Sequence, residues 1–330
     1  MCRETLLKHH LEQPRLLRQL CTLLTRGWFA VGDRFGELYW VERMRELGLA
    51  ELGTVVTYNP WTVPDETPLA EMVRMLAEAD FRHWPVVDSD QRLNGIVSAG
   101  DVVRALEEFA TAVAFRGDPV GSFAELQRRC VADVMTRRPL TIDQHASLAT
   151  ILQVLHDYAI DALPVLEEQE LIGLVTRSDI LREFSYGQWP GAREAVMDTL
   201  EAAADPIESD ASLEDAALAL RLTSASYLGV VRAGFPIGVI SDRDVRGARC
   251  RATLQRFPDQ SWHLPGATTV RELAAQAPTI RPSSRLAQAA TMLLDHHRRA
   301  TAVINQAGRL LGAVTEDGIL RRLTERLSQP

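Results

Sequence analysis

The sequence predicts an α/β fold assembled from four copies of one structural unit. Two observations carry this prediction. In each copy, small or apolar residues recur at positions 0, 3, 4 and 7, which together form one face of an amphipathic helix. About 25 residues after the leading leucine, a short apolar strand begins with glycine and reaches a serine or threonine three residues later. The leading leucines are Leu69, Leu148, Leu213 and Leu286, and the strand glycines are Gly95, Gly173, Gly238 and Gly312.

Every copy predicts the same order of elements: an extended segment, a helix, two strands joined by a polar turn, and a closing helix. In the first copy, residues 60–63 are the extended segment, and the acidic and hydroxyl side chains of 64–67 suit the start of a helix. The two strands are predicted at 84–88 and 95–98, and Asp101 leads into the closing helix. The equivalent strand pairs are 163–166 with 173–176, 228–231 with 238–241, and 302–304 with 312–315.

The four copies are expected to pair, because one unit cannot bury its own apolar face. A polar stretch with glycine and proline at 185–191 separates the second copy from the third, and we place the main boundary there. The predicted organisation is an N-terminal helical extension at 1–54, a first pair of copies at 55–188 and a second pair at 189–330. We interpret the extension as a cap on the first copy, with a partner-binding helix as the alternative.

Composition excludes several classes of function. The net charge of −8 and the pI near 5.6 argue against sequence-independent nucleic-acid binding, which needs a concentrated basic surface. No apolar run of roughly 18 residues and no secretory pattern is found, so no membrane association and a cytoplasmic location are expected. The four cysteines form no CxxC pair. Phosphate-loop, dinucleotide-binding, zinc-protease and nucleophile-elbow motifs are absent, which predicts that the chain is not an enzyme.

The order of elements, with Gly-h-x-[Ser/Thr]-x-x-Asp before the closing helix, resembles the cystathionine-beta-synthase (CBS) domain family. The resemblance covers about residues 55–325, where all four copies carry the glycine and the hydroxyl and three carry the acid. It implies four CBS motifs (β-α-β-β-α) paired into two Bateman modules. Clefts between paired motifs of this family often bind AMP, ADP, ATP, S-adenosylmethionine or a cyclic dinucleotide. A homodimeric, non-catalytic ligand sensor without a tightly bound cofactor or metal is therefore expected.

The motif also suits nucleotide chemistry. A carboxylate at a helix start can accept hydrogen bonds from the vicinal hydroxyls of ribose, and a nearby hydroxyl with free backbone N–H groups suits phosphate. The alternative is that these residues only cap the helix, which stabilises it by about 1 kcal/mol. By the resemblance, the candidate ribose acceptors are Asp101, Asp179 and Asp244, and the candidate hydroxyls are Ser98, Thr176 and Ser241, with Thr315 at the same position of the fourth copy.

Further candidates come from comparing the copies. The extended segment places a threonine near the ligand in family members, and here Thr62 and Thr141 hold that position whereas the third copy has Pro206. Arg177 and Arg243 follow their hydroxyls closely and could face phosphates.

A basic side chain three residues before the proline, or its equivalent, of the first of the two paired strands is also typical of the family. The position holds Arg82 in the first copy and Arg299 in the fourth, but Asp161 and Ser226 in the others. We expect the first module to hold its phosphate mainly through Arg82, because a guanidinium–phosphate pair contributes about 1.5–3 kcal/mol. Gly318 replaces the acid of the fourth copy, which predicts a weak or empty site there.

Two other functions stay open. The chain could be an interaction scaffold whose clefts are structural and unoccupied, with residues 1–54 as the docking element. It could also be an accessory subunit of an enzyme or transporter encoded elsewhere, with an unknown protein partner. Retention of adenosine ligands through purification would separate the sensor from the scaffold.

Overall fold

The computed structural model describes residues 55–78, 82–90, 92–116, 125, 127–201, 206–223, 225–254, 268–275 and 277–328. The described residues form two compact units that are interleaved along the chain. The first unit contains 55–61 and 139–180, and the second contains the rest. The N-terminal extension expected at 1–54 lies outside the described residues.

The first unit is built on a four-stranded sheet in the order β1-β8-β7-β6. Strands β7 and β8 form an antiparallel hairpin, and β6 runs parallel to β7. Helix α7 begins directly after Ser147, whose hydroxyl accepts from the backbone N–H of Thr150. The bounds are Val56–Tyr58 (β1), Ile142–Asp143 (β6), Leu148–Asp157 (α7), Ala162–Glu167 (β7) and Glu170–Thr176 (β8), with α8 (Arg177–Ser185) continuing past the unit.

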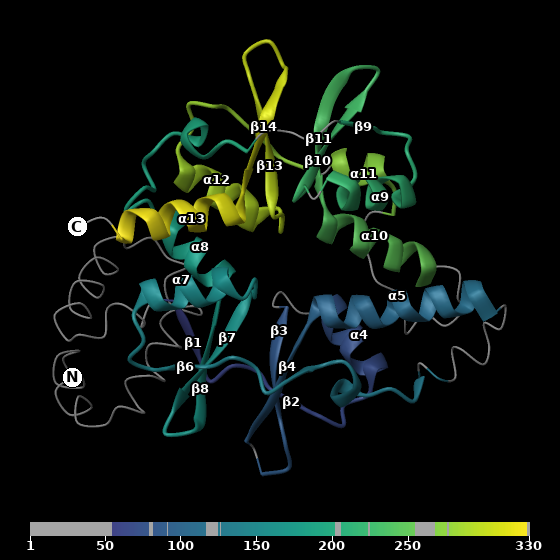
Figure 1. Cartoon of the computed structure of the whole chain (residues 1–330), viewed down its shortest axis with the longest axis vertical. Coiled ribbons are helices and arrows are strands. Elements are labelled where there is room, and N and C mark those ends of the chain that lie inside the picture. The colour runs from purple at the N-terminus through teal and green to yellow at the C-terminus, as the bar shows by residue number, and fades with distance from the viewer. Residues whose placement is uncertain are drawn as a thin grey trace, which may run out of the picture. The chain divides into compact units, whose positions relative to one another are not determined.

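The second unit contains three sheets, in the orders β2-β3-β4-β5, β11-β10-β9 and β12-β13-β14 (Figure 1). Each has an antiparallel hairpin and a two-residue strand parallel to its first arm. The bounds are Val63–Pro64 (β2), His83–Val87 (β3), Leu93–Ser98 (β4), Thr136–Arg137 (β5), Ile207–Glu208 (β9), Tyr227–Arg232 (β10), Phe235–Ser241 (β11), Thr279–Ile280 (β12), Ala300–Ile304 (β13) and Leu310–Thr315 (β14).

The helices confirm the predicted repeat. Helices α4, α7, α9 and α12 each begin at the leading leucine of their copy, and the apolar face predicted by the spacing is buried, except that Leu76, Leu148 and Ala217 are only half-buried. A closing helix follows every hairpin. In the second unit the helices are α4 (Leu69–Glu78), α5 (Ala99–Arg116), α9 (Leu213–Thr223), α10 (Asp242–Leu254), α11 (Val270–Ala275), α12 (Leu286–Asp295) and α13 (Glu316–Leu327), with the 3-10 turns η1 (Val131–Asp133) and η2 (Val196–Thr199).

The segment ahead of each repeat lies on the sheet of its partner repeat. Strand β1, which precedes the first repeat, pairs with β8 of the second, and β5, which precedes the second, pairs with β4 of the first. The same exchange joins the last two repeats. Glu201, ahead of the third, forms an antiparallel bridge with Ala313 of the fourth, and α11, ahead of the fourth, contacts β11 of the third.

This exchange explains the glycine in the second hairpin strand of every copy. The strand was predicted to begin at this glycine, but it begins two or three residues earlier, at Leu93, Glu170, Phe235 and Leu310. A Cβ atom on Gly238 or Gly312 would lie 2.3 or 2.2 Å from the carbonyl oxygen of Ala274 or Glu201, closer than any side chain tolerates. At Gly95 and Gly173 the corresponding carbonyls, of Thr136 and Thr57, lie 2.9 and 3.3 Å away. All four carbonyls belong to residues 12 positions before a leading leucine: Thr57, Thr136, Glu201 and Ala274.

The cores of the repeats are built from the predicted faces. In the first repeat, Leu69 and Met72 of α4 pack with Trp84 of β3 and Leu106 of α5, all almost fully buried. Burial of a side chain of this size contributes about 1.5–3 kcal/mol. Between the last two repeats, a separate cluster joins the two hairpins across their sheets: Tyr227, Val239, Ala300, Ala302 and Ala313.

Candidate functional site

A hydroxyl and a carboxylate are hydrogen-bonded at the start of the closing helix in the first three repeats. In the first, the backbone N–H and the hydroxyl of Ser98 donate to Asp101 Oδ2 at 2.8 and 2.7 Å, and the N–H of Asp101 donates back to Ser98 Oγ at 3.2 Å. Thr176 with Asp179, and Ser241 with Asp244, make the same three bonds. The structure therefore brings the predicted pairs together.

The hydroxyl–carboxylate pair caps the N-terminus of the closing helix, whether or not a ligand binds to it. Ser212 and Asp215 form the same set of bonds at the start of α9, outside the repeated motif. A ligand would have to use the second carboxylate oxygen. Asp101 Oδ1 contacts the guanidinium of Arg104, which is mostly exposed, whereas Asp244 Oδ1 lies 2.8 Å from Nη1 of the buried Arg298. The capping role is observed, and the ligand role stays a prediction.

The residue three positions before the proline, or its equivalent, of the first hairpin strand occupies the same backbone position in three repeats. The carbonyls of Arg82, Asp161 and Arg299 accept from the N–H groups of Ala99, Arg177 and Glu316 at 2.8, 3.0 and 2.9 Å. These N–H groups lie at the start of the closing helices, so the backbone of this residue lies beside the helix start in each of the three repeats.

Two basic side chains and one acidic side chain of different repeats lie close together in the second unit. Burial lowers the pKa of Arg82, although this residue keeps an exposed surface. The neighbouring carboxylate of Asp244 opposes the lowering of that pKa, and the positive charge of Arg299 adds to it. Arg299 Nε also lies 3.9 Å from Glu316 Oε2. Charges of both signs from three repeats therefore influence one another near the start of α10.

The side chain of Arg177 forms hydrogen bonds within its own repeat. The side chain is buried, its Nε donates to the carbonyl of Ile160 at 2.9 Å, and its Nη2 donates to the carbonyl of Leu155 at 2.9 Å. Nε also lies 3.6 Å from Asp161 Oδ1. The guanidinium satisfies carbonyls at and after the end of α7. A contact between Arg177 and phosphate stays a prediction, and it would compete with these bonds.

The other candidates lie where the repeat predicts. Thr62 and Thr141 are exposed and stand directly before β2 and β6. Arg243 is half-buried in the first turn of α10. Thr315 is buried and caps α13, since its hydroxyl accepts from the N–H of Gly318 at 2.9 Å.

The fourth repeat has a carboxylate that the sequence analysis missed. The hydroxyl of Thr315 donates to Oε1 of Glu201 at 2.8 Å. Glu201 precedes the third repeat in the sequence, but it lies beside the fourth, because the segment ahead of each repeat pairs with the partner repeat. Its N–H donates to the carbonyl of Ala313, and its carbonyl accepts from the N–H of Ala313. Its place 12 residues before Leu213 is the only sequence signal that could have found it.

Tyr227 fixes the backbone of Glu201. Its buried hydroxyl donates to the carbonyl of Glu201 at 2.6 Å and accepts from the N–H of Ala313 at 3.1 Å. Burial raises the pKa of Tyr227 to about 12; the hydrogen bond from Ala313 opposes this rise, and the negative charge of Glu201 adds to it.

Tyr227→Phe is expected to lower the free energy of unfolding by about 1–2 kcal/mol at pH 8, because two hydrogen bonds of a buried hydroxyl are lost. The folded pKa is raised from 10.0 to about 12, so the hydroxyl contributes fully below pH 10 and its contribution falls as the pH rises from 10 to 12. The slope is about 1.4 kcal/mol per pH unit. Urea unfolding at pH 8 and pH 11 should show the parent's advantage over the variant shrinking.

Tyr158→Phe provides the control, since Tyr158 is 62% exposed. This variant should unfold as the parent does at both pH values. An advantage of the parent over Tyr227→Phe that stays constant from pH 8 to 11 would contradict the assignment.

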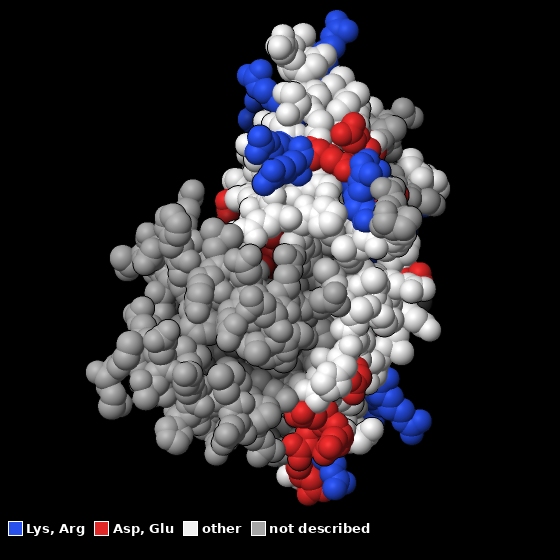
Figure 2. Space-filling view, turned by 90° about the vertical axis from the view of Figure 1, so that its left-hand side faces the viewer, with Lys and Arg blue, Asp and Glu red and all other residues white. Residues whose placement is uncertain are grey.

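On the described part of the face in Figure 2, the two largest groups of acidic side chains each have basic side chains beside them. Among the described residues, no three His, Cys, Asp or Glu side chains are grouped to hold a metal ion. Within the same residues, none of the helices combines the length and apolar character needed to cross a membrane.

A family model described as the CBS domain matches residues 52–108, 131–186 and 270–325, together more than half of the chain. The third repeat lies outside these matches, but it has the same order of helix, hairpin and closing helix as the others.

Known proteins support the same architecture. The chain is 28% identical over 198 residues to an uncharacterized 33.4 kDa protein of Thermofilum pendens, covering 57% of this chain and 61% of that one. It is 46% identical over 54 residues to the CBS domain-containing protein CBSX2 of Arabidopsis thaliana, covering 16% of this chain and 23% of that one. Each match spans less than two thirds of the relative. The crystal structure of protein MJ1225 from Methanocaldococcus jannaschii superposes with a TM-score of 0.61 at 18% identity, covering 80% of this chain and 95% of that one, and shows the fold.

Proposed function

This chain belongs to the CBS domain family, and on that premise we propose that it is a non-catalytic regulatory protein that senses adenosine ligands such as AMP, ADP or ATP. The observation that carries the proposal is the repeated hydroxyl–carboxylate pair at the start of the closing helix. Oδ2 of Asp101 accepts two hydrogen bonds of the cap, and the backbone N–H of Asp101 donates the third to Ser98 Oγ. The other carboxylate oxygen of Asp101 is therefore held in a constant direction, ready to accept from a ligand.

The chemistry of the first repeat suits a nucleotide. Arg104, which contacts the outer oxygen of Asp101, is 58% exposed, so a ligand can displace it at little cost. Each hydrogen bond from a ribose hydroxyl to this carboxylate would contribute about 1.5–3 kcal/mol. Arg82 directly precedes β3, the strand that pairs with β4, and its carbonyl accepts from the N–H of Ala99, the residue after Ser98. Its guanidinium is the proposed phosphate partner in this repeat.

Binding would act by shifting an equilibrium between two arrangements of the repeats, which requires the ligand to favour one of them. We propose that the chain is a homodimer and that the ligand changes a contact of the dimer or of a protein partner. Sedimentation of the purified protein with and without ligand measures this output.

The test is a thermal-unfolding panel with AMP, ADP, ATP, S-adenosylmethionine, cyclic dinucleotides and GMP. A ligand at about a hundred times its dissociation constant should stabilise the protein by about 2.7 kcal/mol, or a few degrees. Adenosine ligands should raise the melting temperature and GMP should not. No rise with any adenosine ligand, from protein shown to be free of bound nucleotide, would contradict the sensor and favour the scaffold.

Asp215→Asn is the matched control for Asp101→Asn. Both substitutions weaken the same kind of helix cap, so both should cost about 1 kcal/mol in the absence of ligand. If Asp101 also binds the ligand, Asp101→Asn should lose the ligand-induced rise in melting temperature, whereas Asp215→Asn should keep it. Equal ligand responses of the two variants would exclude Asp101 from the site.

A further inference from the structure

The fourth repeat lacks the acid of the motif but does not lack a carboxylate. Gly318 stands where the other repeats have Asp101, Asp179 and Asp244. The hydroxyl of Thr315 nevertheless donates to a carboxylate oxygen, Glu201 Oε1, at 2.8 Å. In the other repeats the hydroxyl-to-carboxylate distances are 2.6–2.7 Å. The same polar pair therefore exists in all four repeats.

The Glu201 carboxylate lies at the place that a side chain of residue 318 would occupy. A Cβ atom on Gly318 would lie 3.3 Å from Glu201 Oε1 and 3.1 Å from Thr315 Oγ1. The four residues at the equivalent position 12 before a leading leucine are Thr57, Thr136, Glu201 and Ala274. The single acid among these four residues thus lies in the one repeat that has no acid at the motif position, Gly318.

The backbone of Glu201 is fixed by hydrogen bonds, and its carboxylate is partly exposed to solvent. Its N–H and carbonyl pair with Ala313, and its carbonyl also accepts from Tyr227. The side chain is 25% exposed, and its cationic neighbour, Arg321, is 55% exposed with Nη2 at 3.8 Å from Oε1. A contact of this length to an exposed cation is weak. Oε2 has no hydrogen-bond partner among the described residues.

The third repeat presents the opposite situation. It keeps the acid, but the outer oxygen of Asp244 is paired with the buried Arg298 at 2.8 Å. Within the last two repeats, the carboxylate that is free to accept from a ligand is therefore Glu201 rather than Asp244.

We propose that the fourth repeat binds a ligand bearing vicinal hydroxyls, such as the ribose of a nucleotide, and that Glu201 supplies the carboxylate that accepts from them. This inference rests on the proposed function and names the residue that serves it in the fourth repeat. It reverses the expectation, drawn from Gly318, that this site is weak or empty.

The test counts AMP molecules bound per chain by equilibrium dialysis of the full chain. Glu201→Gln keeps the shape and the backbone bonds of Glu201 but removes the charge, so one class of site should weaken by about 10-fold or more. With 2′,3′-dideoxy-AMP, which lacks the two hydroxyls, the parent and the variant should bind alike at that site.

A rescue experiment separates ligand binding from folding. Glu201→Ala should lose the site, and Gly318→Asp added to Glu201→Ala should restore it, because the new carboxylate arises at the vacated position. Gly318→Asp alone should weaken the site, since its carboxylate would meet that of Glu201. Restored thermal stability without restored AMP binding would overturn the proposal and leave Glu201 as a helix cap.

The outcome also distinguishes this inference from the proposed function. If the parent binds no AMP and no other adenosine ligand, the proposed function fails and this inference fails with it. If the parent binds AMP and Asp101→Asn weakens that binding while Glu201→Gln does not, only the assignment of Glu201 fails.

Discussion

Arg298→Met is expected to lower the free energy of unfolding by about 3 kcal/mol, the largest loss of any substitution considered in this chain. Arg298 and Asp244 form a buried ion pair, with Nη1 and Oδ1 2.8 Å apart, and Nη2 of Arg298 donates to the carbonyl of Leu273 at 3.0 Å. The substitution removes the nearest cation of the Asp244 carboxylate and the donor to the carbonyl of Leu273. Arg82 also faces Asp244, which keeps the loss near the lower end of the range for broken buried pairs.

The measurement is thermal unfolding by calorimetry, in which a loss of this size should lower the melting temperature by about 6–12 °C. Adding Asp244→Asn to Arg298→Met should recover much of the stability, because the unpaired charge is removed together with its partner. Arg299→Met is the control at the neighbouring residue. Arg299 Nε lies 3.9 Å from Glu316 Oε2, and Arg299 is half-buried. Arg299→Met should therefore lower the free energy of unfolding by about 1 kcal/mol or less. Equal losses for the two arginines would contradict the role of Arg298.

The fold could be predicted wherever the information lay within one repeat. The helices beginning at Leu69, Leu148, Leu213 and Leu286 and the hairpins after them follow from local periodicity, and the structure confirms both. The polar pairs such as Ser98 and Asp101 were predicted for the same reason, since both members lie in one short motif.

The exchange of leading segments could not be predicted in this way. The exchanged strands β1 and β5 are three and two residues long, too short to carry an alternating pattern. Their partners are also set by packing between repeats rather than by neighbours in the sequence. Glu201 and Arg298 were missed for this reason, because each acts on a motif of another repeat. The glycine present in all four copies was noticed in the sequence. Its physical reason, a carbonyl of a residue far away in the sequence that leaves no room for a Cβ atom, could not be read there.

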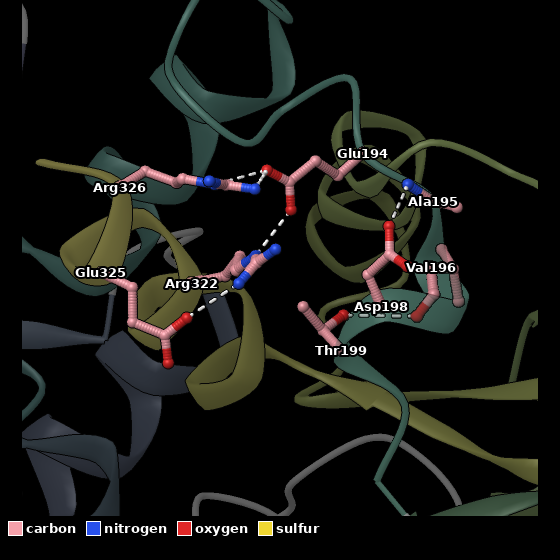
Figure 3. Close-up of polar contacts among 8 residues, drawn as sticks. All are labelled: Glu194, Ala195, Val196, Asp198, Thr199, Arg322, Glu325 and Arg326. Carbon is pink, nitrogen blue, oxygen red and sulfur yellow. Dashed lines mark hydrogen bonds and ion pairs between the residues drawn. The ribbon is translucent and has the colours of Figure 1, made fainter. Parts of the chain in front are cut away.

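The second large effect is expected for the segment that leads from the second repeat to Glu201. Glu194 in this segment accepts from Nε of Arg322 and Nε of Arg326 at 2.6 Å each, with one carboxylate oxygen for each arginine (Figure 3). The two arginines are one helical turn apart on α13, and the hydrogen bond from Arg322 to Glu194 raises the pKa of Arg322. The carbonyl of Glu194 also accepts from the N–H of Leu286 at the start of α12. Glu194 thus connects the segment ahead of the third repeat to both α12 and α13 of the fourth repeat.

Glu194→Gln should therefore lower the free energy of unfolding by about 2 kcal/mol, since two charge-assisted bonds are weakened while all three side chains keep some contact with water. Urea unfolding measures this loss, which should shrink in 1 M NaCl as the charges are screened. Glu325→Gln is the matched control: Glu325 also pairs with Arg322, but it is 49% exposed and its loss should cost about 0.5 kcal/mol or less. Equal losses for the two glutamates would show that the leading segment is not fastened by Glu194.

The same variant connects stability with the proposed site. Glu201 lies seven residues after Glu194 in the segment that α12 and α13 hold, and η2 lies between them. If Glu194 keeps this segment in register, Glu194→Gln should also weaken the binding of AMP that depends on Glu201, although Glu194 does not contact Thr315 or Gly318. Binding at Asp101 should be unaffected, because its cap is formed within the first repeat. An equal loss of AMP affinity at both sites would indicate general unfolding rather than control of the fourth repeat by its leading segment.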